Sequence, residues 1–135
     1  MKQNNEKRFA KWKRPRIVDG RPTRYGWIVQ GKKNFKLGKN TDIGAFTYIH
    51  AKHGVFIEDE VQVGSHCSIY SHSTIDGKKG SVTLGRNCKI GSHSVMMPGV
   101  RVGKNSIVGA FSFVNKSIPD NVVAWGVPAR VMRKV

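Results

Sequence analysis

At 135 residues the chain is long enough for one compact domain, and two independent hydrophobic cores would be hard to fit. Hydrophobic residues make up 39% of it, mostly Val and Ile spread along the sequence, and no apolar run approaches the length that spans a bilayer. The basic N-terminus lacks the apolar stretch of a secretory signal, so the composition excludes a membrane-spanning protein and predicts a cytoplasmic one.

The net charge of +16 favours an anionic partner, such as a nucleic acid, a membrane surface or a phosphorylated small molecule. Residues 1–36 hold 12 Lys and Arg against Glu6 and Asp19, a balance of +10, and the remaining 99 residues hold only +6. We therefore expect a basic N-terminal extension over residues 1–30, followed by one folded domain over 31–135. Such a basic extension is more often a solvated tail or a cap than a nucleic-acid site, so nucleic acid is not the partner we expect.

An aliphatic residue, usually followed by Gly, recurs at six-residue intervals from Leu37 onwards. The positions are Leu37, Ile43, Ile49, Ile57, Val63, Ile69, Ile75, Leu84, Ile90, Met96, Val102, Val108 and Val114. A period of six fits neither an α-helix nor a simple alternating strand, but it fits a short strand plus a corner. Three such units close a triangular coil, and stacked coils bury the aliphatic column. The sequence therefore predicts an all-β fold, a parallel β-helix solenoid with a C-terminal cap over residues 127–133.

Two insertions interrupt the repeat, one between Ile49 and Ile57 and one between Ile75 and Leu84. The second is polar and glycine-rich around residues 77–80, and insertions in a solenoid bulge outwards at corners, so we interpret it as a candidate active-site loop. With Ile75 counted as a core position, His72 is predicted to stack one coil from His93. The same count places Cys67 and Cys88 one above the other, as two buried thiols.

Residues 82–134 closely resemble the hexapeptide-repeat acetyltransferases of the galactoside and maltose O-acetyltransferase type. The specific part is SIPDNVVAWGVPAR following GAFSFVNK, and the close resemblance covers roughly 40% of the chain. It implies a left-handed β-helix, a homotrimer, and acetyl-CoA as co-substrate in the groove between neighbouring subunits. Carried over residue by residue, it implies that Ser92 and Ala110 meet the pantetheine arm through backbone groups, that Asn115 and Lys116 follow along the cofactor, and that Arg130 and Arg133 lie near its phosphates. Asn115 departs from the Thr of many relatives.

Acetyl transfer needs a base for the acceptor's proton, and histidine is the natural one. His72 lies in Ser71-His72-Ser73, just before the glycine-rich loop, and resembles the Ser-His-Ser element of many sugar acetyltransferases. In galactoside-type relatives the catalytic histidine falls about one hexad later. We expect His72 to be the catalytic base, with His93, His50 and His66 as alternatives, and no bound metal.

The predicted function is acetyl transfer to a hydroxyl or amine of a sugar or a nucleotide-linked amino sugar, with Tyr48, His50 and Tyr70 as candidate acceptor contacts. One alternative is a γ-class carbonic-anhydrase-like metalloprotein, which needs three converging ligands. Its two close histidines usually stand five residues apart, whereas His66 and His72 stand six apart. A second alternative, a non-enzymatic basic scaffold, leaves the Val-Pro-Ala-Arg signature unexplained.

Overall fold

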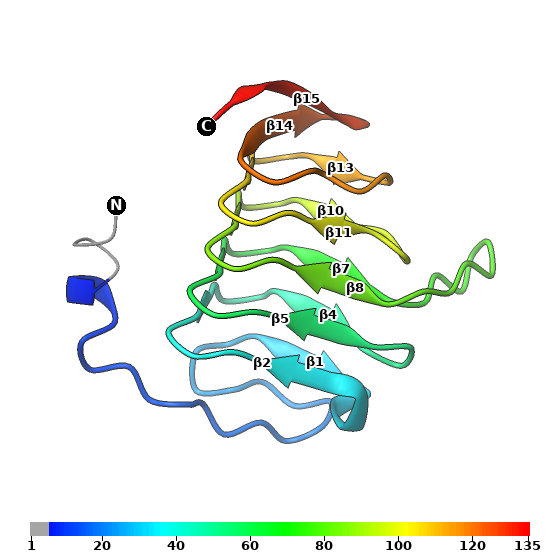
Figure 1. Ribbon diagram of the computed structural model, residues 1–135. Helices are drawn as coiled ribbons and strands as arrows, with labels where there is room; N and C mark the ends of the chain where they lie inside the picture. The colour runs from blue at the N-terminus through cyan, green and yellow to red at the C-terminus, as the bar shows by residue number, and fades with distance from the viewer. Residues whose placement is uncertain (1–5) are drawn as a thin grey trace.

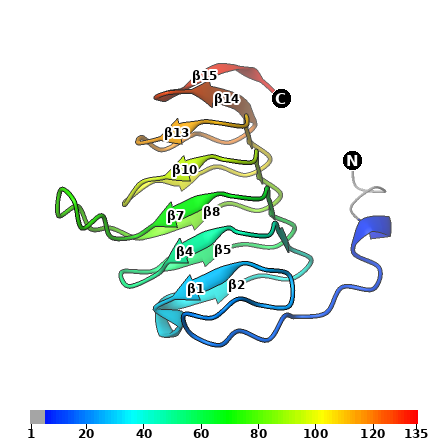
Figure 2. The same cartoon turned by 180° about the vertical axis from the view of Figure 1, so that it is seen from behind.

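The computed structural model describes residues 6–135 and shows a parallel β-helix with three walls (Figures 1 and 2). Sheet A contains β1 (Ile28–Gln30), β4 (Tyr48–His50), β7 (Ser68–Tyr70), β10 (Val95–Met96) and β13 (Phe113–Val114). Sheet B contains β2 (Phe35–Leu37), β5 (Val55–Ile57), β8 (Val82–Leu84) and β11 (Arg101–Val102). Sheet C contains β3 (Asp42–Ile43), β6 (Gln62–Val63), β9 (Lys89–Ile90), β12 (Ile107–Val108), β14 (Val122–Gly126) and β15 (Ala129–Lys134).

The chain passes from sheet A to B to C in each coil, and this order defines three edges of the prism, which we call the AB, BC and CA edges. The solenoid begins with β1 at Ile28, three residues before the predicted domain boundary at residue 31. A short 3₁₀ turn, η1 (Lys32–Asn34), follows at the AB edge.

The core is a set of aliphatic columns, as the six-residue repeat predicts. Val29, Ile49, Ile69, Met96 and Val114 stack along sheet A, and each side chain is 0% exposed. Fully burying one such side chain stabilises the fold by about 1.5–3 kcal/mol. Because no single coil could bury these residues alone, stacking of successive coils holds the fold together.

The repeat position assigned to Ile75 was wrong. Ile75 is 98% exposed in a loop between β7 and β8, and the repeat position after Ile69 is filled by Leu84. Two hairpin hydrogen bonds close the base of this loop, from Ser73 N to the Lys78 carbonyl and from Gly80 N to the Ser71 carbonyl. The loop stands clear of the prism in Figures 1 and 2. An outward apolar residue at six-residue spacing is indistinguishable from a core residue by sequence pattern.

This longer insertion shifts the coil register by one wall. Val63 lies opposite Ile90, so His93 stacks on His66, and the predicted stacking of His72 on His93 was wrong. Cys67 and Cys88 are not stacked on each other either, because they precede strands of different sheets. Ser68, directly after Cys67, pairs with Tyr48 and Val95 in sheet A. Lys89, directly after Cys88, pairs with Gln62 in sheet C. Both cysteines are buried and free, which confirms the prediction of two buried thiols.

Segments outside the repeats cover one wall and one end of the solenoid. Residues 6–18, which we call the strap, run beside sheet C, where the Arg8 guanidinium pairs with Asp42 and Trp12 Nε1 donates to the Thr41 carbonyl at 2.8 Å. At the other end, β15 pairs antiparallel with β14 and confirms the predicted C-terminal cap. Across residues 6–135, no helix has the length and apolar character needed to cross a bilayer.

Candidate active site

Three histidines gather at the AB edge, beneath the protruding loop. The His72 ring centroid lies 5.9 Å from that of His50 and 5.1 Å from that of His53, with both ring pairs edge to face. The tyrosines predicted as acceptor contacts flank the cluster, with Tyr48 and Tyr70 ring centroids 6.1 Å apart. Two consecutive coils therefore contribute to one patch, in which β4 presents His50, the corner after β4 presents His53, and the loop base after β7 presents His72.

Ser71 joins the two coils of this cluster by hydrogen bonds. Its side chain is fully buried, Oγ donates to the His50 carbonyl at 2.7 Å, and the same Oγ accepts from the His53 backbone N–H at 3.0 Å. An isolated antiparallel bridge between His72 and Lys79 then sets the position of His72 at the root of the loop. The Ser71-His72 pair thus acts as one unit, in which the serine joins two coils and the histidine faces outwards.

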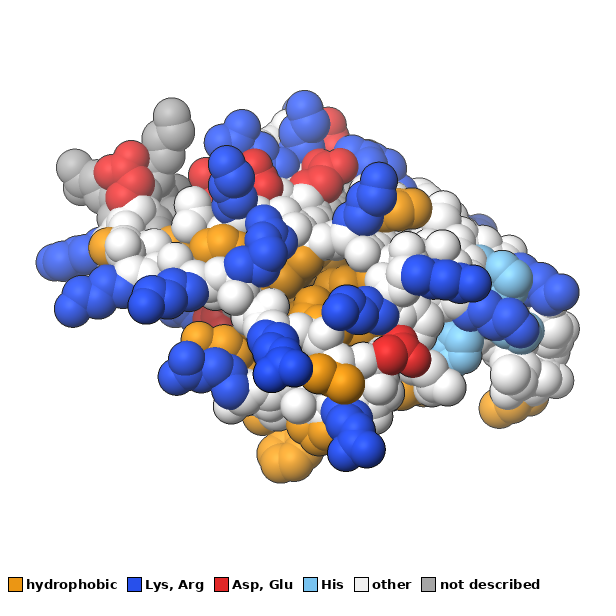
Figure 3. All heavy atoms as spheres, turned by 90° about the horizontal axis from the view of Figure 1, so that it is seen from below, with side chains coloured by type: hydrophobic (Ala, Val, Ile, Leu, Met, Phe, Trp, Pro, Cys, Tyr) orange, Lys and Arg blue, Asp and Glu red, His pale blue; other side chains and the backbone are white. Residues whose placement is uncertain are grey.

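The surroundings of His72 favour its neutral form. Partial desolvation, and then the positive charges of Lys52, His53, Lys79 and His50, lower the pKa of His72 below its usual value of 6.5. A neutral imidazole at neutral pH can accept a proton, which is what a general base requires. Figure 3 shows His side chains beside Lys and Arg at this side of the molecule.

His50 supplies a second polar group at this patch. Its Nδ1 atom is buried and has no hydrogen-bond partner among residues 6–135. Burial, the nearby Tyr70 and Asp19 raise the pKa of Tyr48, so its phenol remains a hydrogen-bond donor at neutral pH. Tyr48 donates through this hydroxyl to Gln30 Oε1. An imidazole nitrogen without a partner and a fixed phenol are groups that can orient a polyhydroxy ligand.

A groove of about 580 Å³ runs along sheet C. Its floor is a row of glycines near the CA edge, and its lining includes the predicted cofactor residues Ser92 and Ala110. A Cβ added to Gly91 would collide with the Ala110 backbone, and one added to Gly64 would lie 2.6 Å from Ser92 N. Only glycine permits such close stacking of coils, and it leaves backbone groups accessible along the groove.

The other predicted cofactor residues fall into two groups. Trp125 stacks on Gly109 and pairs in register with Arg130, so Arg130 continues the glycine row that runs beside Ser92 and Ala110 at the CA edge. Arg133 lies further along β15, opposite Val123. Asn115 and Lys116 follow β13 and are exposed at the AB edge, above the histidine cluster.

Within one chain, the structure does not bring His72 beside Ser92. Ser92 lies before the sheet A strand of its coil and His72 lies after the sheet A strand of the preceding coil, so the width of sheet A separates the two residues. The AB edge carries His72, Asn115 and Lys116, and the CA edge carries Ser92, Ala110 and Arg130. The predicted site residues therefore form two half-sites on different edges of the same prism.

An aromatic ladder at the CA edge was missed in the sequence. The His66 and His93 rings stack at 4.7 Å and 7°, and the His93 and Phe111 rings at 4.8 Å and 4°, with Phe46 at 4.9 Å from His66 on the other side. All four residues have positive φ, from 58° to 66°. The signal was present, because each residue stands two positions after a repeat glycine. His93 and Phe111 directly follow Ser92 and Ala110, so the ladder borders the groove.

The cysteines take no part in either half-site. Burial, with a smaller contribution from Glu58, raises the pKa of Cys88 to about 12, and burial also raises the pKa of Cys67. Both are protonated at neutral pH and poor nucleophiles. Over residues 6–135, no group of three or more His, Cys, Asp or Glu side chains is arranged to hold a metal ion.

A family model and the related sequences point to the same family. The bacterial transferase hexapeptide (six repeats) model matches residues 81–116. A galactoside O-acetyltransferase of Lactococcus lactis subsp. lactis (strain IL1403) is 36% identical over 113 residues, which cover 73% of this chain. The chain spans only 55% of that relative's length.

Solved structures agree with the sequence comparison. A galactoside acetyltransferase in complex with coenzyme A matches with a TM-score of 0.73 and 35% identity, over 80% of this chain and 58% of the other. A mutant of AntD, an N-acyltransferase from Bacillus cereus in complex with dTDP and coenzyme A, matches with a TM-score of 0.73 and 26% identity, over 80% and 66%. The chain therefore belongs to the hexapeptide-repeat transferase family and is similar, within it, to the galactoside and maltose O-acetyltransferases.

Proposed function

We propose that this protein transfers an acetyl group from acetyl-CoA to a hydroxyl or amine of a sugar or nucleotide-linked sugar, with His72 as the general base. The observation that carries the proposal is the presence of two complementary half-sites. The AB edge offers a base whose pKa is lowered, and the CA edge offers a glycine-floored groove whose glycine row leads towards Arg130. The similarity to a galactoside acetyltransferase bound to coenzyme A supports the donor. The similarity to AntD bound to dTDP supports a nucleotide-linked acceptor.

The groove fits the donor in both shape and chemistry. Its glycine floor is open to a narrow, flexible chain such as pantetheine, and the backbone at Ser92 and Ala110 supplies hydrogen-bonding groups. The guanidinium of Arg130 suits phosphate oxygens, which it can hold with two parallel hydrogen bonds. Arg133 on the same strand would add a second positive charge at this end.

A homotrimer would unite the two half-sites. In a closed ring each chain presents one edge to one neighbour and a different edge to the other. If the AB edge of one chain packs against the CA edge of the next, His72, Asn115 and Lys116 of one chain face the groove of its neighbour. Each trimer then has three equivalent sites, and an isolated chain has none complete.

His72 would take the proton of the acceptor as its oxygen or nitrogen attacks the thioester carbonyl. Bound acetyl-CoA supplies an activated acyl group whose thiolate can leave. The proton held on His72 then passes to that thiolate, which gives coenzyme A and the acetylated acceptor and returns the imidazole to its neutral state. Desolvation, and then the charges of Lys52 and Lys79, lower the pKa of the resting imidazole and so favour its neutral form. A cytoplasmic location would suit the two free cysteines.

Calorimetric titration with acetyl-CoA, followed by a thiol-release assay against a panel of sugars and nucleotide sugars, tests the proposal. Saturable binding and acceptor-dependent release of coenzyme A are expected. Arg130→Ala should weaken acetyl-CoA binding, whereas Lys13→Ala, which removes a cation outside the groove lining, should not. Absence of detectable binding of acetyl-CoA at millimolar concentration would contradict the proposed activity.

A further inference from the structure

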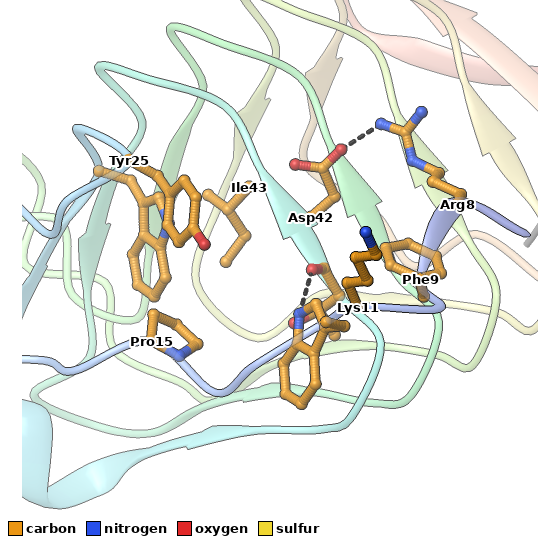
Figure 4. A pocket seen from close by; sticks show the side chains of 10 residues that line it. Arg8, Phe9, Lys11, Pro15, Tyr25, Asp42 and Ile43 are labelled. Carbon is orange, nitrogen blue, oxygen red and sulfur yellow. Dashed lines mark hydrogen bonds and ion pairs between the residues drawn. The ribbon is translucent and has the colours of Figure 1, made fainter.

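A cavity of about 370 Å³ lies between the strap and the first coil, and the proposed reaction leaves it without a role. We call it the strap pocket. Its apolar walls are formed by Phe9, Trp12, Pro15, Tyr25, Trp27 and Ile43 (Figure 4). Its volume falls within the range of small-molecule sites.

The walls of the strap pocket are fixed in place. Phe9 and Trp27 are 8% and 2% exposed, and the Trp12 indole is anchored by its hydrogen bond to the Thr41 carbonyl. Trp27 also packs on Phe35, with ring centroids 6.2 Å apart. Tyr25 differs, because it is 50% exposed and its ring is accessible to a ligand. The pocket is therefore a formed cavity with one open aromatic face.

Aromatic walls of this kind bind flat rings. Four of the six apolar residues are aromatic, and a nucleobase stacked on an aromatic side chain gains about 1–3 kcal/mol, with little dependence on which base it is. Arg14 and Arg24 lie 5.4 and 5.2 Å from the ring centroids of Trp12 and Tyr25. These guanidinium groups add positive charge around the pocket.

The charge at the rim favours an anion. Arg8 and Lys11 line the pocket together with one acidic residue, Asp42, and Asp42 is already paired with Arg8. Within the described part of the chain, Lys11 makes no hydrogen bond or ion pair, so its ammonium group is available. Residues 6–16 hold six Lys and Arg against Glu6 alone. Figure 4 shows Arg8 and Lys11 on the same side of the cavity, opposite Tyr25 and Pro15.

The strap pocket is contiguous with the groove, because Arg8 and Asp42 line both. It lies at β3, one edge strand of sheet C, whereas Arg130 lies on β15, the other edge strand. A ligand in the strap pocket would therefore not compete with phosphates held at Arg130.

We infer that the strap pocket binds the nucleoside diphosphate part of the acceptor, with the base against Tyr25 and Trp12, the phosphates near Lys11 and Arg8, and the sugar directed into the groove. The inference rests on the proposed acetyl transfer and names the class of its acceptor. The strap thus supplies the recognition element, which explains why aromatic and basic residues alternate in a segment outside the repeats.

Titration of the full chain with dTDP, UDP, GDP and ADP, followed by tryptophan fluorescence and calorimetry, tests the inference. Saturable binding of at least one diphosphate is expected, and added salt should weaken it. Tyr25→Ala and Lys11→Ala should each raise its Kd about ten-fold. Lys13→Ala, two residues along the same strap and outside the pocket, should leave the Kd unchanged. Absence of binding, or equal effects of Lys11→Ala and Lys13→Ala, would overturn the inference.

Coenzyme A also contains a nucleoside diphosphate, and the same variants separate the two sources. If Tyr25→Ala weakens binding of coenzyme A and not of the free diphosphates, the pocket holds the donor and the inference is wrong. Acetylation of simple sugars without diphosphate binding would likewise reject the pocket and keep the proposed function. Diphosphate binding that depends on Tyr25, in a protein that does not bind acetyl-CoA, would support the pocket and contradict the function.

Discussion

His66 and His93 lie with their rings parallel and 4.7 Å apart, one coil above the other at the CA edge. This stack fixes the register of the two central coils, because it requires Val63 to face Ile90. It also removes His93 from the neighbourhood of His72, which lies with His50 and His53 at the AB edge. The two histidine groups therefore belong to different half-sites.

The register can be checked by stability. Ile69→Ala removes a fully buried side chain and should lower the free energy of unfolding by about 2–5 kcal/mol. Ile75→Ala changes a side chain that is 98% exposed and should shift the free energy of unfolding by less than about 0.5 kcal/mol. Denaturant unfolding measures both. Equal losses would mean that Ile75 is a core residue after all.

The sequence predicted the prism because thirteen aliphatic positions repeat at one period, which no helix or meander shares. It could not place Ile75, since a loop residue with the right spacing looks like a core residue until burial is known. It identified Ser92, Ala110 and His72 through resemblance to a family. Their separation onto two edges depends on which wall each residue occupies, and that depends on the length of the insertion.

Loss of the base should reduce turnover more than binding. His72→Asn should lower kcat by about 10²–10⁴-fold, because an amide cannot accept the acceptor's proton, while the Kd of acetyl-CoA stays unchanged. Thr74→Val, in the same loop, is the matched control and should retain activity. If His72→Asn kept full kcat, His50 would be the next histidine to test as the base.

The pH profile reports the charges around His72. Because desolvation and the neighbouring cations lower its pKa, His72 stays neutral to a lower pH than a free imidazole, and the acid limb of kcat/KM should lie below pH 6.5. Lys79→Met removes one of these cations and should move the limb to higher pH. The same shift should appear in an NMR titration of the His72 ring.

Lys78→Met is the control for that profile, since Lys78 lies beside Lys79 in the sequence but pairs with Asp76 at 3.9 Å. It should leave the acid limb where it is. A limb that moves equally in both variants would show that net charge, and not the position of Lys79, sets the titration.

The groove should tolerate no added bulk. Ala110→Trp places a large side chain beside Ser92 on an exposed corner, so we expect the fold to persist while acetyl-CoA binding falls below detection. Circular dichroism and calorimetry separate these two effects. Retained tight binding would exclude this groove as the donor site.

Complementation between two inactive variants tests the central claim, that one site is built from two chains. His72→Asn lacks the base and Ala110→Trp lacks the groove, so each alone should be inactive. When the two are mixed in equal amounts and reassembled, a groove from one should meet a base from the other at about a quarter of the interfaces of a closed ring, restoring about a quarter of wild-type activity. Mixed assemblies as inactive as either variant alone would contradict a site shared between neighbouring chains.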